Sequence, residues 1–208
     1  VATGKAASMG ILFKDAATLE QLRSVDTVVL DKTGTLTTGK PMVTDVLPNT
    51  DKAALMRVAA ALERKSEHPF AKAILRKIGE QKPPLAENFE TLPGRGVAAT
   101  VAGIRYYGGN RRLMEELCIS VPEYSELKAQ GKTPLYFACG GKMLGIIAVA
   151  DTVKSDSCKA VRELKNMGVQ VVMLTGDSRE TACAVARGCG ILHEKSAVLS
   201  GEELARLD

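Results

Sequence analysis

Two short apolar runs, far apart in the chain, are each followed at once by a polar loop that contains glycine. The first run, residues 27–30 (TVVL), leads into residues 31–35 (DKTGT), and the second, residues 169–174 (VQVVML), leads into residues 175–177 (TGD). Runs of β-branched and apolar residues are typical of a parallel strand that helices cover on both faces. Helically spaced apolar residues flank both runs. The pattern predicts an open parallel α/β sheet, which binds its ligands at the carboxyl ends of the strands.

A long stretch with a different pattern, Pro41 to Ile147, lies between these two halves. It opens with an alternating strand at residues 42–47 and continues with two helices separated by His68–Pro69. Short alternating runs follow, including a hairpin that turns at Gly140–Gly141, and such hairpins build antiparallel sheets. The sequence therefore predicts an α/β domain interrupted by an inserted α+β domain.

This pattern divides the chain into four expected segments. Residues 1–14 are expected to be a linker, residues 15–40 and 148–208 the two parts of the α/β domain, and residues 41–147 the inserted domain. At about 100–200 residues per domain, a chain of 208 residues has room for this arrangement.

The composition excludes several classes of protein. The longest apolar runs, such as Ile146–Ala150, fall far short of the roughly 20 residues that a membrane-spanning helix requires. The net charge of +4 comes from interspersed residues, and with 4% aromatic residues and no Trp the sequence gives no indication of nucleic-acid binding. Five scattered cysteines without a CxxC pair argue against a disulfide framework or a zinc site.

The two polar loops carry the candidate chemistry. Asp31 follows a strand directly, and Lys32 and Thr33–Thr35 after it offer a cation, hydroxyls and backbone N–H groups. A carboxylate in this position can attack a phosphoryl group, although an Asp after a strand can also simply cap a helix or turn. In the second loop, Thr175 offers a hydroxyl and Asp177 a further carboxylate near a metal ion or nucleotide, which favours phosphoryl transfer.

Residues 31–37 (DKTGTLT) resemble the phosphorylation signature of the P-type ATPases, and residues 175–177 match their TGD motif. This resemblance implies a haloacid-dehalogenase-like phosphorylation domain in which Asp31 accepts the γ-phosphate of ATP. It also implies that Asp31 and the backbone carbonyl of Thr33 hold Mg²⁺, while Lys32 and Thr175–Gly176–Asp177 complete the catalytic site. Hydrolases of this superfamily have an acid/base Asp where this chain has Thr33, so water attack on the phosphoenzyme should be slow.

The inserted segment resembles the nucleotide-binding domain of the heavy-metal-transporting branch. The resemblance implies that ATP is bound by Glu63, His68, Gly94, Gly96 and Asn110. Neutral His68 could stack on adenine or hydrogen-bond to it, and the two glycines let backbone approach a ligand closely. Taken singly, a His before Pro is more often a helix terminator, and a Gly-x-Gly is usually a turn.

Residues 151–154 (DTVK) resemble the hinge at which the chain re-enters the phosphorylation domain; a helix N-cap at Asp151 or Ser155 is the alternative. Residues 3–14 resemble the segment after the metal-binding membrane helix of copper(I) pumps, whereas residues 198–204 look closer to calcium-type pumps. The family's GDGxND loop is not found before the chain stops at Asp208, so we expect the phosphorylation domain to be incomplete.

The resemblance as a whole implies a region on the cytoplasmic face of a membrane pump. Its partners would be ATP and the membrane and actuator domains of the same pump, and the transported ion would bind elsewhere. Two alternatives remain open at this point: a soluble phosphatase of the same superfamily, and a nucleotide-binding module without turnover.

Overall fold

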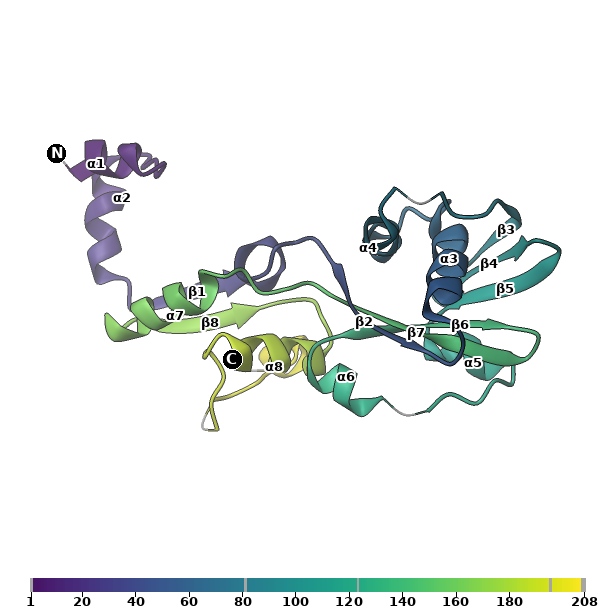
Figure 1. Cartoon of the computed structure of the whole chain (residues 1–208). Coiled ribbons are helices and arrows are strands. Elements are labelled where there is room, and N and C mark those ends of the chain that lie inside the picture. Colours follow the sequence, from purple (N-terminus) through teal and green to yellow (C-terminus); the bar gives the residue numbers. More distant parts are fainter. Residues whose placement is uncertain (1, 81, 123, 195, 207–208) are drawn as a thin grey trace.

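The computed structural model describes residues 2–206 except residues 81, 123 and 195. Within these residues the strands form two sheets, a parallel pair β1–β8 and a six-stranded antiparallel sheet in the order β2-β7-β6-β5-β4-β3. Figure 1 shows the two sheets as separate bodies joined by two lengths of chain. The predicted fold class, a parallel α/β unit with an inserted antiparallel α+β unit, is confirmed.

The strands and helices have the following bounds. The strands are β1 (Thr27–Asp31), β2 (Met42–Pro48), β3 (Ala86–Leu92), β4 (Gly96–Val101), β5 (Ile104–Gly109), β6 (Thr133–Cys139), β7 (Lys142–Ala150) and β8 (Gln170–Leu174). The α-helices are α1 (Ala2–Ser8), α2 (Ala16–Gln21), α3 (Lys52–Glu63), α4 (Pro69–Ile78), α5 (Arg111–Glu116), α6 (Ser125–Ala129), α7 (Ser157–Asn166), α8 (Arg179–Gly188) and α9 (Gly201–Leu204).

The parallel pair has one buried face and one open face. Strand β1 pairs with β8 so that Asp31 lies opposite Leu174. Val171 on β8 packs with Val161 of α7, and α8 joins the same cluster, so both helices cover one face. On the other face the residues Val29 and Leu174 are 59% and 60% exposed. The prediction that these strands are buried on both faces is therefore wrong for the described residues, because α7 and α8 lie on the same side.

The six-stranded sheet is covered by different elements on its two faces. Helices α3 and α4 pack on the face that carries Phe137 and Val149, whereas α5 packs on the face that carries Tyr136 and Ile146. This division follows from the strand period of two, which turns successive side chains to opposite faces. The β6–β7 hairpin turns at Gly140–Gly141 as predicted.

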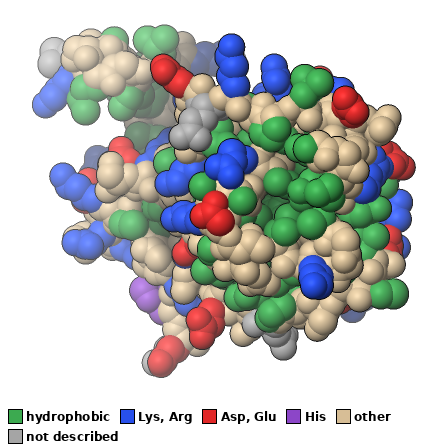
Figure 2. All heavy atoms as spheres, turned by 45° about the vertical axis from the view of Figure 1, so that its right-hand side comes forward, with side chains coloured by type: hydrophobic (Ala, Val, Ile, Leu, Met, Phe, Trp, Pro, Cys, Tyr) green, Lys and Arg blue, Asp and Glu red, His purple; other side chains and the backbone are tan. Residues whose placement is uncertain are grey.

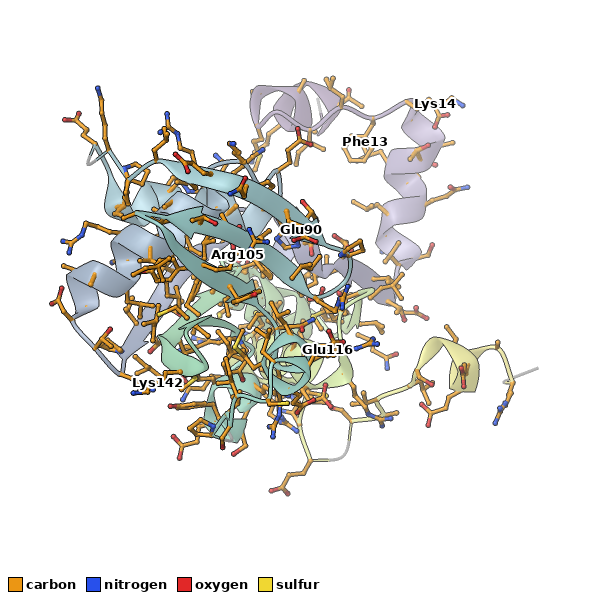
Figure 3. All side chains as sticks on the ribbon, turned by 90° about the vertical axis from the view of Figure 1, so that its right-hand side faces the viewer. Phe13, Lys14, Glu90, Arg105, Glu116 and Lys142 are labelled. Atoms are coloured by element: carbon orange, nitrogen blue, oxygen red, sulfur yellow. The ribbon has the colours of Figure 1, made fainter. Side chains whose placement is uncertain are left out.

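Charged residues ring the outer surface of the inserted unit. In Figure 3, Arg105 of β5 and Glu90 of β3 lie across β4 from each other, and their side chains pair at 2.7 Å. Figure 2 shows hydrophobic side chains gathered near the middle of the visible face, with basic and acidic side chains around them. None of the helices in the described part of the chain combines the length and apolar character that a bilayer span needs.

The two lengths of chain that join the units are fastened to each other. Thr37 and Val153 form an isolated antiparallel bridge. Asp151 accepts hydrogen bonds from the hydroxyls of Thr37 (2.5 Å) and Thr38 (3.1 Å). The expected N-cap at Asp151 or Ser155 is wrong, because α7 begins only after Asp156 and that residue caps it without a side-chain hydrogen bond.

Residues just beyond Asp151 also hold the loop that follows β1. The Lys154 ammonium group donates to the Gly34 carbonyl at 2.7 Å, and the buried Ser157 hydroxyl donates to the Leu36 carbonyl at 2.9 Å. The re-entering chain thus supports the DKTGTLT loop directly.

We expect Asp151→Ala to lower the free energy of unfolding by about 2 kcal/mol, because two hydroxyl donors lose a charged acceptor. Urea denaturation of the chain measures this change. Asp156→Ala is the matched control: it removes a nearby carboxylate that makes no capping bond, and it should cost less than about 0.5 kcal/mol. Equal effects of the two substitutions would contradict the fastening role of Asp151.

Candidate active site

The loop after β1 forms one wide turn that leaves the Asp31 carboxylate uncommitted to capping. The turn covers residues 32–36 and is closed by a hydrogen bond from the Thr37 N–H to the Lys32 carbonyl (3.0 Å), with Gly34 at φ +79°. Asp31 is exposed at the end of β1 and makes no side-chain capping hydrogen bond. The alternative in which Asp31 serves as a cap is therefore wrong.

An ion pair joins the two predicted catalytic loops. Lys32 Nζ lies 2.6 Å from Asp177 Oδ2, and the side chains of Lys32 and Asp177 are 7% and 34% exposed. The Asp177 N–H in turn donates to the Thr175 hydroxyl at 3.2 Å. Because Asp31 and Leu174 are paired in register, both loops leave the sheet at the same level. The structure thus brings Asp31, Lys32, Thr175 and Asp177 to one edge of the parallel pair.

The remaining loop residues leave this edge open. Thr33 and Gly176 are exposed, and a side-chain carbon added at Gly176 would have no described atom within 4 Å. Among the described residues there is no group of three or more His, Cys, Asp or Glu side chains that could hold a metal ion. The oxygen atoms available here are the carboxylates of Asp31 and Asp177 and the loop carbonyls and hydroxyls, all of them hard donors.

In the inserted unit, Asn110 ties the β3–β4 turn to the start of α5. Its side-chain amide donates to the Gly94 carbonyl at 2.8 Å, and its side-chain oxygen accepts from the Leu113 N–H at 3.1 Å as the N-cap of α5. The Asn110 N–H also donates to the Arg95 carbonyl at 2.8 Å. Three of the five predicted nucleotide-site residues, Gly94, Gly96 and Asn110, therefore lie on adjoining pieces of backbone.

The two glycines of this turn have different reasons to be glycine. At Gly96 an added Cβ atom would lie 2.1 Å from the Gly108 carbonyl oxygen, so the close approach of β4 and β5 excludes any side chain. Gly94 adopts φ +67°, a left-handed conformation, and faces open space with no atom within 4 Å of an added Cβ. The open side of Gly94 leaves its backbone accessible to a ligand.

Glu63 and His68 lie at the junction of α3 and α4. Glu63 is 8% exposed, and burial raises the pKa of its carboxyl to about 7, while a hydrogen bond with Ser66 opposes the rise. His68 is the N-cap of α4, and its Nδ1 accepts from the Phe70 N–H at 3.2 Å. The ring of His68 also meets that of Phe70 edge-on, with centroids 4.6 Å apart.

Packing brings the end of α3 close to the end of β5. A side-chain carbon at Gly108 would lie 3.3 Å from Leu62, the residue before Glu63. The end of α3 is thus packed on the end of β5, whereas the contacts of His68 lie within its own turn. His68 does cap the start of α4, as the helix-terminus interpretation expected. Because its Nδ1 accepts a hydrogen bond, a neutral ring carries its proton on Nε2.

A family model described as haloacid dehalogenase-like hydrolase matches residues 25–206. The chain belongs to this family. Among its curated relatives, a copper-exporting P-type ATPase of Staphylococcus epidermidis is 42% identical over 210 residues, covering 98% of this chain and 26% of that protein. A copper-exporting P-type ATPase of Bacillus subtilis is 40% identical over 213 residues, covering 99% and 27%. The chain thus spans about a quarter of these relatives.

Solved structures give the same picture for this haloacid dehalogenase-like chain. The crystal structure of a zinc-transporting PIB-type ATPase in its E2.Pi state superposes with a TM-score of 0.78 at 37% identity, covering 91% of this chain and 32% of that one. The catalytic domain of the CPx-ATPase CopB-B superposes with a TM-score of 0.66 at 22% identity, covering 91% and 68%, and shows a shared fold. The resemblance to the heavy-metal P-type ATPases is confirmed at this level, whereas the roles of the individual site residues stay predictions.

The sequence did not predict the residues that hydrogen-bond to the backbone of the DKTGTLT loop. Lys154 and Ser157 bind the Gly34 and Leu36 carbonyls, and neither contact has a sequence signal beyond the hinge-like DTVK segment. The partnership of Lys32 with Asp177 was also missed, because the resemblance assigned Lys32 to the phosphoryl group alone.

The buried Glu63 predicts a pH-dependent stability. Because the folded pKa of about 7 lies above the ordinary value of 4.5, the folded chain holds the extra proton between these pH values. The Glu63 contribution to the free energy of unfolding therefore falls as pH rises from 4.5 to about 7. Glu63→Gln, which has no proton to lose, should gain on the order of 3 kcal/mol relative to the parent chain between pH 4 and pH 8.

Urea denaturation of both chains at the two pH values checks this difference. Glu67→Gln, which changes an exposed carboxylate four residues away, is the matched control and should follow the parent chain at both pH values. A constant offset between Glu63→Gln and the parent would show that folding does not raise the pKa of the Glu63 carboxyl.

Proposed function

We propose that this chain is the ATP-binding and aspartyl-phosphorylation region of a heavy-metal P-type ATPase. The observation that carries the proposal is the uncapped Asp31 carboxylate, which stands at the strand edge where the Lys32–Asp177 ion pair joins the DKTGTLT and TGD loops. The copper-exporting relatives, which match nearly the whole chain, support the same conclusion.

In the proposed reaction, an Asp31 carboxylate oxygen attacks the γ-phosphorus of ATP. A new P–O bond forms to Asp31, the bond between the γ-phosphorus and the bridging oxygen breaks, and ADP leaves with the electron pair. Lys32, the Thr175 hydroxyl and the Gly176 N–H are the donors available for the phosphoryl oxygens. Approach of the phosphate would let Lys32 share its charge between Asp177 and the incoming anion.

The donor set at this edge fits Mg²⁺. Asp31, the Thr33 carbonyl and Asp177 are hard oxygen donors, and Mg²⁺ is usually held by one or two carboxylates together with substrate phosphates. When bound, Mg²⁺ neutralises negative charge on the transferring phosphoryl group.

The inserted unit, residues 41–147, is the proposed nucleotide-binding domain, set into a phosphorylation domain of residues 15–40 and 148–208 after a linker of residues 1–14. His68 would donate from Nε2 to adenine, and Glu63, half protonated near neutral pH, would offer a second hydrogen-bonding group. Gly94 would let the backbone come close to ATP, while Gly96 lets β4 lie against β5 and Asn110 holds the turn in place.

The proposed cargo is copper(I), which would bind to other parts of the pump. This choice is supported by the copper-exporting relatives and by the likeness of residues 3–14 to copper pumps. The proposed partners are the membrane and actuator domains of the same pump, with this region on the cytoplasmic face.

Thr33 favours a phosphoenzyme over a phosphatase. A group two residues after the nucleophile is placed to activate water, and a Thr hydroxyl is a far weaker general base than a carboxylate. The aspartyl phosphate should therefore persist long enough to be coupled to ion transport.

We expect a pump that contains this chain to take up label from γ-labelled ATP and Mg²⁺ in an acid-stable, hydroxylamine-labile bond. Asp31→Asn should abolish the label, because the amide is not a nucleophile toward phosphorus. Asp26→Asn, which changes an exposed carboxylate just before β1, is the control and should keep the label. Label that survives in Asp31→Asn would place the phosphate elsewhere.

We expect His68→Asn to weaken ATP binding to the isolated chain about 5- to 30-fold, equivalent to roughly 1–2 kcal/mol for a lost hydrogen bond and ring contact. Asn is a good N-cap residue, so this substitution keeps the start of α4 while it removes the Nε2 donor. Titration calorimetry gives the affinity, and an unchanged thermal midpoint verifies the fold. Unchanged affinity would leave His68 with its capping role alone.

A further inference from the structure

Helix α6 of the inserted unit packs against α8 of the phosphorylation unit, which begins shortly after the TGD loop. Figure 1 shows the two helices side by side below the six-stranded sheet. Apart from the two connections, it is the most extensive contact between helices or strands of the two units in the described residues.

The contact brings the turn after α6 into close approach with α8. Gly131, in the turn that ends α6, would place an added Cβ atom 3.2 Å from Ala184 Cβ and 3.7 Å from the Thr181 carbonyl oxygen. The turn is fixed on its other side, because Lys132 Nζ pairs with Asp45 of β2 at 2.8 Å. The turn is thus held to the sheet by an ion pair on one side, and on the other side Gly131 packs against α8.

Charged and aromatic groups extend the contact. A cavity of about 220 Å³ lies beside it, with Arg111, Tyr124, Lys128 and Tyr136 on one wall and Glu180 on the other. The pKa of Glu180 is lowered by hydrogen bonds from its own backbone N–H and from Ser178, and the charges of Lys128 and Arg179 lower it further.

Both walls of this cavity adjoin the candidate site. Arg111 follows Asn110, the cap that holds the Gly94 turn, and Glu180 comes three residues after Asp177. The contact nevertheless lies on the Tyr136 face of the six-stranded sheet, whereas Glu63 and His68 belong to α3 and α4 on the Phe137 face. Figure 1 accordingly shows α3 and α4 on the side of the sheet away from α8.

We propose that the α6 turn and α8 form a clasp, in which Gly131 seats on Ala184 and Lys128 faces Glu180, that holds the inserted unit away from Asp31. This inference rests on the proposed function. A rotation about the fastened connections that brings the nucleotide on α3 and α4 toward Asp31 carries α6 off α8. ATP bound to both half-sites and the closed clasp therefore exclude each other, and the clasp sets how readily the phosphoryl group reaches Asp31.

This competition is reciprocal. If bound ATP shifts the equilibrium of the clasp toward the open state by some factor, closing the clasp weakens the affinity for ATP by the same factor. AMP, which lacks the phosphates that reach toward Asp31, needs no rotation and should not depend on the clasp.

The test locks the clasp with a disulfide. Gly131→Cys and Ala184→Cys are introduced together in a chain carrying Cys183→Ala, since Cys183 is a free thiol next to the engineered one. A separation of 3.2 Å between the Cβ atoms needs only a few tenths of an ångström to reach the usual disulfide range of about 3.5–4.5 Å. Gly140→Cys with Ala184→Cys is the matched control, because Gly140 also has positive φ but has no atom within 4 Å of an added Cβ.

We expect the 131–184 pair to oxidise readily with diamide, the 140–184 pair to stay reduced, and ATP·Mg²⁺ to slow the oxidation several-fold. The oxidised 131–184 chain should bind ATP about fivefold more weakly or worse and AMP unchanged, with both affinities restored by reduction. Lys128→Glu should speed opening, and Lys128→Glu with Glu180→Lys should reverse that effect.

Three outcomes would overturn the clasp. A 131–184 pair that does not oxidise shows that the contact is absent, and oxidation that is indifferent to ATP, in a chain that binds ATP normally, shows that the clasp does not oppose closure. Ready oxidation with no binding of either nucleotide would overturn the proposed nucleotide site and the regulation with it, so the two failures are told apart.

Discussion

The hydrogen bonds from Thr37 and Thr38 to Asp151 are the contact on which the rest of the arrangement depends. The chain leaves the parallel pair once and returns once, and this carboxylate joins the two passages at the point where they cross. Thr37 belongs to the DKTGTLT loop, and Asp151 follows β7 of the antiparallel sheet. A single half-buried carboxylate thus relates the position of the inserted unit to the loop that begins at Asp31. Lys154 and Ser157 extend the same support to the loop backbone.

The elements that were predicted from the sequence are those whose pattern is strongly periodic or sharply punctuated. The run before Asp31, the helix after Asp51 and the hairpin at Gly140–Gly141 all appear where their residues indicated. Strand β3 (Ala86–Leu92) was not predicted, because a bulge between Glu87 and Glu90 breaks its alternation and it lies at the edge of the sheet. Helices α5 and α6 are only six and five residues long, too short for a period to show.

The candidate site was predictable as a set of residues but not as an arrangement. Motifs name Asp31 and Asp177, yet nothing in a linear sequence states that Lys32 is buried against Asp177 or that Glu63 is buried enough to raise its pKa. The first property comes from contact between residues 32 and 177, which lie in different halves of the chain, and the second comes from the burial of Glu63 at the end of α3. Two of the proposed nucleotide-site residues also have a structural role, since His68 and Asn110 each cap a helix, and only the His68–Pro69 pair indicated this in the sequence. A substitution at either position changes local structure and ligand contacts together.

The open face of the parallel pair has a consequence for handling this chain in isolation. Val29, Val172 and Leu174 present an apolar strip on two strands whose outer edges carry unpaired backbone groups. Such a strip with free edges is a template for intermolecular strand addition, the event from which β-aggregates start. We therefore expect self-association of the isolated chain to begin at these two five-residue strands. Val29→Lys would put a positive charge on the open face of the strand pair and oppose such association. It would not disturb the buried cluster on the opposite face.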